Sequence, residues 1–163
     1  PPWAPLVSGA PSAVKIAKAV QLWEASGKLG GRTLPDDVPD TWPEELAELL
    51  KTSSCLPVDV REPGVGGTEE VRGSERLSFF SVFANVEECM PVIGKLQGDA
   101  RKIVLFSEAG DRMGTCAIVG ALLQDIFRID RARVTRLRGG CAAWAAYLAK
   151  NPSAARSIEP LSV

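Results

Sequence analysis

The sequence predicts an α/β fold, in which helices cover both faces of a central parallel sheet and one more helix precedes it. Two observations carry this prediction. From Thr41 onward, helical patterns alternate with short apolar runs. One run, Ile103-Val104-Leu105-Phe106, is apolar without interruption, as expected of a strand buried on both faces. A chain of 163 residues, 45% of them hydrophobic, can form one such domain with an extension.

The N-terminal part of the chain predicts the additional helix. Residues 1–11 are rich in proline and small residues and should form an irregular arm. Ser12 can cap a helix that runs to about Gly27. We expect its apolar stripe to consist of Val14, Ala17, Val20 and Trp23. A connector rich in Gly, Pro and Asp follows, up to about residue 40.

The elements of the main domain follow in a regular order. We expect helices over about 43–51, within 82–96, over 113–127 and over 141–150, and strands over 56–60, 103–106 and 134–137. Asp40 or Thr41 can cap the first of these helices, and Pro91 limits the regularity of the second. Residues 63–75 should form a Gly-rich loop.

The segment after the Phe106 strand is the candidate site, since ligands of parallel sheets bind beyond the carboxyl ends of the strands. It leads into the helix that begins near Met113. A tight loop before a helix points several backbone N–H groups into one concavity, which favours an anion. The residues of this loop are Ser107, Glu108, Ala109, Gly110, Asp111 and Arg112.

Composition excludes several kinds of site. The chain has no histidine, which rules out Ser-His and Cys-His catalysis. Its four cysteines form no CxxC pair, so a zinc site is disfavoured and we expect neither a metal nor a cofactor. Free, buried thiols in a reducing, intracellular compartment fit this pattern best. The net charge of −1 gives no reason to expect a nucleic-acid partner, and no apolar run is long enough to span a membrane.

Several motifs resemble the rhodanese family of sulfurtransferases, over about residues 41–150. The segment 58–63 reads V-D-V-R-E-P, similar to the family's strand signature, and 71–74 reads V-R-G-S, a worn form of its I-P-G-A segment. The segment 137–144 reads L-R-G-G-C-A-A-W, similar to the closing L-x-G-G-x-x-A-W. The resemblance implies a three-layer α/β/α fold. We therefore divide the chain into an extension (1–40), a rhodanese-like domain (41–150) and a C-terminal tail (151–163).

The active loop of the family usually reads C-x-x-G-x-R. Gly110 and Arg112 match this pattern, but Ser107 stands where the resemblance places the catalytic cysteine. A rhodanese thiolate attacks a donor sulfur and holds it as a persulfide, whereas a serine hydroxyl is not ionised near neutral pH. Glu108 and Asp111 replace residues that are often arginine and asparagine, and each would repel an anionic donor by about 1 kcal/mol. The loop is therefore interpreted as vestigial.

Two hypotheses about enzymatic activity remain open. The loop favours a pseudoenzyme, without catalytic residues. The alternative is an active thiosulfate or persulfide sulfurtransferase that carries a Cys→Ser substitution at position 107. The related phosphatases have a loop one residue longer, of the form C-x(5)-R. The loop from Ser107 to Arg112 has the shorter length, which disfavours a phosphatase.

A non-catalytic chain would serve as a structural subunit or protein-interaction module of a larger assembly. Trp3 and Trp23 in the extension and Arg131, Arg136 and Arg138 in an arginine-rich stretch are the expected partner contacts. The alternatives are a helix that covers the domain's own sheet edge and an ordinary solvated charged face. The extension and the missing initiator methionine suggest an imported, processed accessory subunit. A mitochondrial complex such as ATP synthase is one concrete hypothesis.

Overall fold

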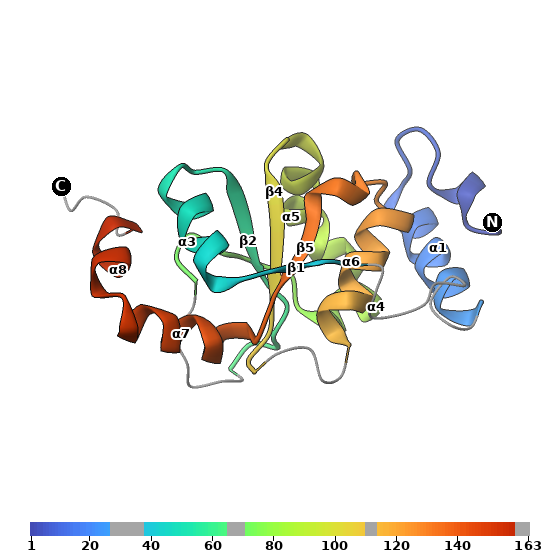
Figure 1. The fold of residues 1–163 in the computed structure, drawn as a ribbon. Coiled ribbons are helices and arrows are strands. Elements are labelled where there is room, and N and C mark those ends of the chain that lie inside the picture. The colour runs from blue at the N-terminus through green and yellow to red at the C-terminus, as the bar shows by residue number, and fades with distance from the viewer. Residues whose placement is uncertain (27–37, 65–70, 110–113, 159–163) are drawn as a thin grey trace.

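The computed structural model describes residues 1–26, 38–64, 71–109 and 114–158 (Figure 1). Its centre is a five-stranded sheet in the order β1-β5-β4-β2-β3, and all neighbouring strands run parallel. The strands are β1 (Asp40–Thr41), β2 (Cys55–Asp59), β3 (Glu75–Arg76), β4 (Lys102–Phe106) and β5 (Val134–Leu137). The predicted parallel sheet is therefore confirmed.

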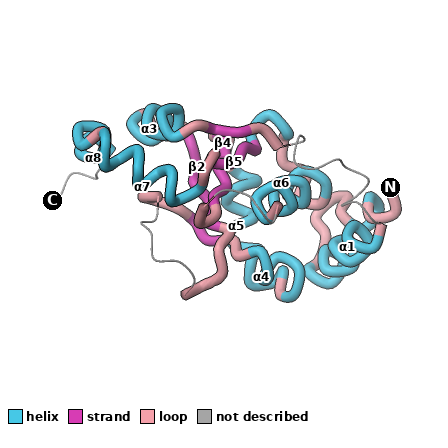
Figure 2. The backbone as a smooth tube through the Cα atoms, turned by 60° about the horizontal axis from the view of Figure 1, so that its bottom comes forward, coloured by secondary structure: helices cyan, strands magenta, loops and turns pink. Residues whose placement is uncertain are grey.

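Helices cover both faces of this sheet (Figure 2). One face is covered by α4 (Phe79–Ala84), α5 (Val86–Gly98) and α6 (Thr115–Asp125), and the other by α3 (Pro43–Lys51) and α7 (Gly140–Lys150). The helix α1 (Ala13–Ala25) lies outside α4 and α5, and α8 (Pro152–Ile158) contacts α3 and α7. Two short 3-10 helices, η1 (Ala4–Leu6) and η2 (Arg131–Arg133), complete the described elements. The three-layer prediction is confirmed.

The strand β4 shows why the sheet needs both helical layers. Ile103 and Leu105 pack into the core under α5 and α6, while Val104 and Phe106 pack into the core under α3 and α7. All four side chains are fully buried. Successive side chains of a strand point to opposite faces, so an uninterrupted apolar run leaves neither face open to water.

The N-terminal helix forms as predicted, but its buried face differs from the expected one. Ser12 is its N-cap and its side chain accepts a hydrogen bond from the Lys15 backbone at 3.3 Å. The buried side chains are Ile16, Ala19, Val20 and Trp23. Their i, i+3, i+4, i+7 spacing is the pattern of a core-facing stripe. Val14, which was expected in the stripe, is 66% exposed.

The two tryptophans expected as partner contacts are part of the chain's own core. Trp23 is 0% and Trp3 7% exposed. The indole Nε1 of Trp23 donates to Asp125 Oδ2 at the end of α6, at 2.8 Å, and its ring lies beside Phe83 of α4. The helix α1 therefore packs on the helical layer, and Trp3 and Trp23 are buried within the chain.

Several predicted details need correction. Trp42, not Asp40 or Thr41, is the N-cap of α3, because the latter two residues form β1. Residues 82–96 were expected to hold one helix, but the structure has α4 and α5 meeting at Asn85, with Pro91 inside α5. The expected tail contains α8. Across the described ranges, no helix combines the length and the apolar character needed to cross a membrane.

Candidate functional site

The candidate site lies at the carboxyl edge of the sheet, where segments following four strands meet. The loop after β4 is held against α7 by two backbone bonds, from Cys141 N to Ser107 O and from Ala142 N to Glu108 O, both 2.8 Å. On its other side, Val60 N donates to Phe106 O at 3.1 Å. The first N–H groups of α7, which have no partner within the helix, are thus satisfied by the loop itself.

The structure describes the first half of the predicted loop. Ser107 is half-buried and directly follows β4, and Ala109 is exposed. Gly110, Asp111 and Arg112 lie outside the described residues. The helix α6 begins beyond them, after Gly114, whose φ of +71° is a left-handed conformation that suits glycine.

A buried ion network underlies the loop. The hydrogen bonds between Asp59 and Arg61 include one from Nε to Oδ1 at 3.0 Å and one from Nη2 to Oδ2 at 2.9 Å. Their side chains are only 2% and 6% exposed. The remaining guanidinium nitrogen of Arg61, Nη1, donates to Glu108 Oε2 at 2.6 Å. The hydrogen bonds that Arg61 donates to Asp59, and then to Glu108, hold its pKa well above the ordinary value.

A second arginine closes the network from β3. Arg76 Nη2 donates to Asp59 Oδ2 at 3.2 Å, and its Nη1 donates to the Arg61 carbonyl at 3.1 Å. Two arginines therefore face two carboxylates, Asp59 and Glu108, and these four charges sum to zero. The neighbouring Glu62 adds a further negative charge and accepts a hydrogen bond from Phe80 N at 2.8 Å. Together, these five residues carry more negative than positive charge, which does not favour an anion at this edge of the sheet.

The four cysteines are free and buried, as predicted. Burial raises the pKa of the Cys55 thiol to about 11 and also raises the pKa of Cys89. Cys116 and Cys141 lie in the first turns of α6 and α7, with 2% and 0% exposure. Buried thiols are shielded from donors and acceptors, so none of the four takes the place of Ser107 as an accessible nucleophile. In the described part of the chain, no cluster of acidic or thiol side chains could hold a metal ion.

The arginines expected as partner contacts make ion pairs within the chain. Arg136 and Arg138 both bind Asp40, each at 3.0 Å, and so tie β1 to β5. The Arg136 side chain is only 14% exposed, which removes it from any partner surface. Arg131 is 65% exposed and lies 3.5 Å from Asp125. Arg138 is also exposed, and its guanidinium lies 4.5 Å from the ring centroid of Trp42.

The sequence analysis did not predict that Glu108 pairs with Arg61 or that Arg76 binds Asp59. The Asp59-x-Arg61 spacing could have suggested the pair between these two residues, since Asp59 ends β2 and Arg61 lies two positions beyond it. No sequence signal places Arg76 there, because β3 is only two residues long.

Comparison with solved structures identifies the architecture. One similar structure is that of Ygr203w from Saccharomyces cerevisiae, which is described as a homologue of single-domain rhodanese and of the Cdc25 phosphatase catalytic domain. Its TM-score is 0.56 at 20% sequence identity, and the match covers 72% of this chain and 86% of Ygr203w. The chain has a rhodanese-like fold. In a second structure, Ygr203w is described as a protein tyrosine phosphatase of the rhodanese family. Its TM-score is 0.55 at 19% sequence identity, and the match covers 73% of this chain and 92% of Ygr203w.

A third similar structure comes from Rhodopseudomonas palustris. This protein, of unknown function and described as a possible tyrosine phosphatase, has a TM-score of 0.50 and 17% identity, over 80% of this chain and 89% of that one. No family model matches the sequence, and no curated protein matches it. At such identities the likeness concerns the fold, and function has to be argued from the site.

Proposed function

We propose that this chain is a catalytically inactive rhodanese-like domain that serves as a structural or protein-interaction module of a larger assembly. The observation that carries the proposal is the pairing of Glu108 with Arg61 beside Ser107. Sulfur transfer requires a nucleophile that can form a persulfide and a positive environment for an anionic donor. Here the nucleophile position holds a hydroxyl, and the carboxylates of Asp59 and Glu108 both pair with Arg61.

Ser107 lacks the usual activating base. The chain contains no histidine to act as a general base. The neighbouring carboxylate, Glu108, is engaged in an ion pair with Arg61 at 2.6 Å. The same reasoning extends to phosphatase chemistry, which in the related enzymes uses a cysteine and a loop one residue longer than Ser107 to Arg112. We therefore propose no phosphatase activity for this chain.

The described surface offers a contact patch for the interaction role. Trp42 is 48% exposed at the β1 edge of the sheet, with Arg138 stacked on its ring. Tryptophan and arginine are enriched in the central contacts of protein interfaces. We propose these two residues, in place of Trp3 and Trp23, as partner contacts. The identity of the assembly stays a prediction, and a mitochondrial complex such as ATP synthase is the hypothesis to test by co-purification and mass spectrometry.

The test of inactivity compares thiosulfate and mercaptopyruvate turnover in the chain as given, in Ser107→Cys and in Ser107→Cys combined with Glu108→Arg. We expect no sulfurtransferase activity from the first two, because the cysteine alone leaves Glu108 on Arg61. An active rhodanese provides the positive control, and circular dichroism confirms that each variant is folded. Substantial turnover by Ser107→Cys alone would support the alternative, an active enzyme carrying a Cys→Ser substitution.

A further inference from the structure

Four arginines gather at the amino edge of the sheet, on the segments that follow α5 and α6. Arg101 directly precedes β4, Arg128 follows α6, and Arg131 and Arg133 belong to η2, which leads into β5. The two segments are joined, because Arg133 Nε donates to the Arg101 carbonyl at 2.8 Å. Together these four residues form the arginine face. Ser107 follows the carboxyl end of β4 and therefore lies at the opposite edge of the sheet.

The arginine face carries a local surplus of positive charge. Residues 99–102 and 125–133 contain four arginines and one lysine against three aspartates, so two positive charges are in surplus. The aspartates, Asp99, Asp125 and Asp130, each accept a hydrogen bond from within the chain. The whole chain has a net charge of −1, so this surplus distinguishes the amino edge from the rest of the molecule.

The guanidinium groups of this face are accessible to a ligand. Arg133 donates to two backbone carbonyls, those of Arg101 at 2.8 Å and Leu96 at 2.9 Å. These carbonyls hold the guanidinium in place but leave its charge uncompensated. The Arg131 side chain is 65% exposed, with its nearest carboxylate at 3.5 Å. Arg128 is exposed, and within the described residues it forms no hydrogen bond or ion pair.

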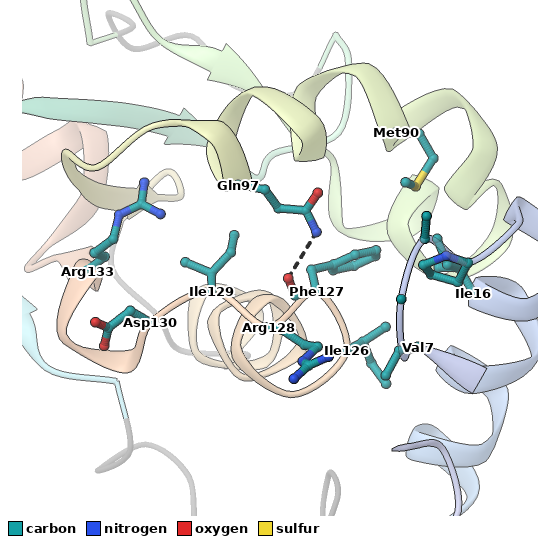
Figure 3. Close-up of a pocket in the computed structure, with 13 residues that line it drawn as sticks. Val7, Ile16, Met90, Gln97, Ile126, Phe127, Arg128, Ile129, Asp130 and Arg133 are labelled. Atoms are coloured by element: carbon teal, nitrogen blue, oxygen red, sulfur yellow. Dashed lines mark hydrogen bonds between the residues drawn. The ribbon is translucent and has the colours of Figure 1, made fainter. Parts of the chain in front are cut away.

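A half-open hollow of about 730 Å³ lies beside the arginine face (Figure 3). Arg128 and Arg133 line it, together with Gln97 of α5 and residues 9–11 of the N-terminal arm. The apolar side chains that border it are almost fully buried, so its accessible lining is at least as polar as it is apolar. Arg101 and Arg131 are not among the described lining residues. A ligand that reaches the whole arginine face must therefore extend beyond the hollow.

We propose that the arginine face binds an extended acidic segment of a partner protein, whose carboxylates pair with Arg128, Arg131 and Arg133. Bonds between guanidinium groups and carboxylates are among the stronger hydrogen bonds of proteins. Asp130 is exposed between these arginines and would repel a nucleic-acid backbone, which carries a charge on every unit, whereas a peptide can place an uncharged residue there. This inference rests on the interaction role proposed above and not on the chemistry of Ser107.

Fluorescence anisotropy with the full chain tests this proposal. The probe is a short labelled peptide that alternates glutamate and serine, and its matched control has glutamine in place of each glutamate. The Debye length shortens from about 30 Å at 0.01 M salt to about 8 Å at 0.15 M, so we expect the glutamate peptide to bind about tenfold more weakly at the higher salt. The glutamine peptide should bind at least about tenfold more weakly than the glutamate peptide at low salt.

Three outcomes of this experiment would overturn the proposal. The first is no binding of the glutamate peptide at low salt, and the second is equal affinity for the glutamine peptide. The third is binding of a labelled oligothymidylate of equal length as tightly as the glutamate peptide, since that would assign the arginine face to a nucleic acid.

Variants of equal charge locate the contact. Arg128→Gln and Lys150→Gln each remove one positive charge, but Lys150 is exposed at the end of α7, on the other face of the sheet. We expect Arg128→Gln to weaken binding of the glutamate peptide about threefold, and Arg128→Gln combined with Arg131→Gln to weaken it about tenfold. Lys150→Gln should leave the affinity unchanged, and circular dichroism checks that each variant is folded.

Equal affinities of the Arg128→Gln, Lys150→Gln and unchanged chains would contradict the inference, because the peptide would then bind elsewhere. The peptide assay does not involve Ser107. A failure of this inference and a failure of the proposed inactivity are therefore seen in different measurements, the first in peptide binding and the second in sulfur transfer.

Discussion

Asp59 and Arg61 show how burial changes the contribution of a short-range ion pair to the free energy of unfolding. The chain contains a second pair of the same spacing, Asp99 and Arg101, with nearly the same geometry. The Asp99 and Arg101 side chains are 22% and 38% exposed, against 2% and 6% for Asp59 and Arg61. Arg101 holds the pKa of Asp99 at about 2, mainly through its side-chain hydrogen bonds. The two pairs therefore form a matched test within one molecule.

We predict that Asp59→Asn lowers the free energy of unfolding by about 3 kcal/mol, because it leaves a buried guanidinium without its main carboxylate. Urea denaturation followed by circular dichroism measures this change. Asp99→Asn is the control and should have a much smaller effect, since solvent replaces the lost partner. Equal losses in the two variants would show that burial does not set the strength of the Asp59 pair.

At the scale of elements, the loop between β5 and α7 depends on a glycine. Gly139 has a φ of +79°, and a Cβ atom at this position would lie 2.5 Å from the Cβ of Ala143. This turn directs α7 toward the loop that contains Ser107. Both the backbone conformation and the contact therefore require glycine here.

Gly139→Ala should lower the free energy of unfolding by at least about 2 kcal/mol, through backbone strain and steric overlap. Gly94→Ala is the matched control, because Gly94 is an exposed residue of α5 with no atom within 4 Å of an added Cβ. Gly94→Ala should raise the free energy of unfolding by about 0.5–1 kcal/mol. Chemical denaturation of both variants gives the comparison, and a stable Gly139→Ala protein would refute this account of the turn.

How well each element could be predicted depended on its length and burial. The apolar run at β4 fixes this strand almost to the residue, since both of its faces are buried, and the strand predicted over 134–137 coincides with β5. By contrast, β1 and β3 have two residues each, too few for any period to show. The N-terminal helix was predicted with its cap but with a different buried face. The buried face of α1 is chosen by its tertiary contacts with α4 and α5. The 3.6-residue period alone does not decide which of two neighbouring apolar stripes is buried.

At the scale of the whole molecule, the N-terminal extension is part of the fold. Four residues of α1 belong to the same apolar core as β2, β4 and β5. Trp23 is fully buried there and is tied to α6 through Asp125. The division at residue 40 that sequence patterns suggest therefore does not correspond to two separate cores among the described residues.

We predict that Trp23→Ala lowers the free energy of unfolding by about 3–5 kcal/mol, as expected for a large core side chain. Trp42→Ala, a tryptophan that is 48% exposed and contacts Arg138, should cost less than about 1 kcal/mol. Thermal and urea unfolding of the two variants measure the difference. A small loss for Trp23→Ala would mean that α1 contributes little to the core.

Sequence motifs placed Ser107 directly after a strand of the sheet, and the structure has it after β4, because the loop position follows from the α/β pattern. They could not provide its charge balance. The bond between Arg61 and Glu108 joins residues that are 47 positions apart, and Arg76 reaches Asp59 from another strand. Such pairings depend on how the loops meet in three dimensions.

The central claim is that a hydroxyl group at Ser107 prevents the chain from carrying sulfur. Intact-protein mass spectrometry after incubation with thiosulfate, followed by cyanide, tests this most directly. We predict no species heavier by one sulfur atom, and no change on adding cyanide. A sulfur adduct that cyanide removes, borne by the chain as given, would contradict the claim.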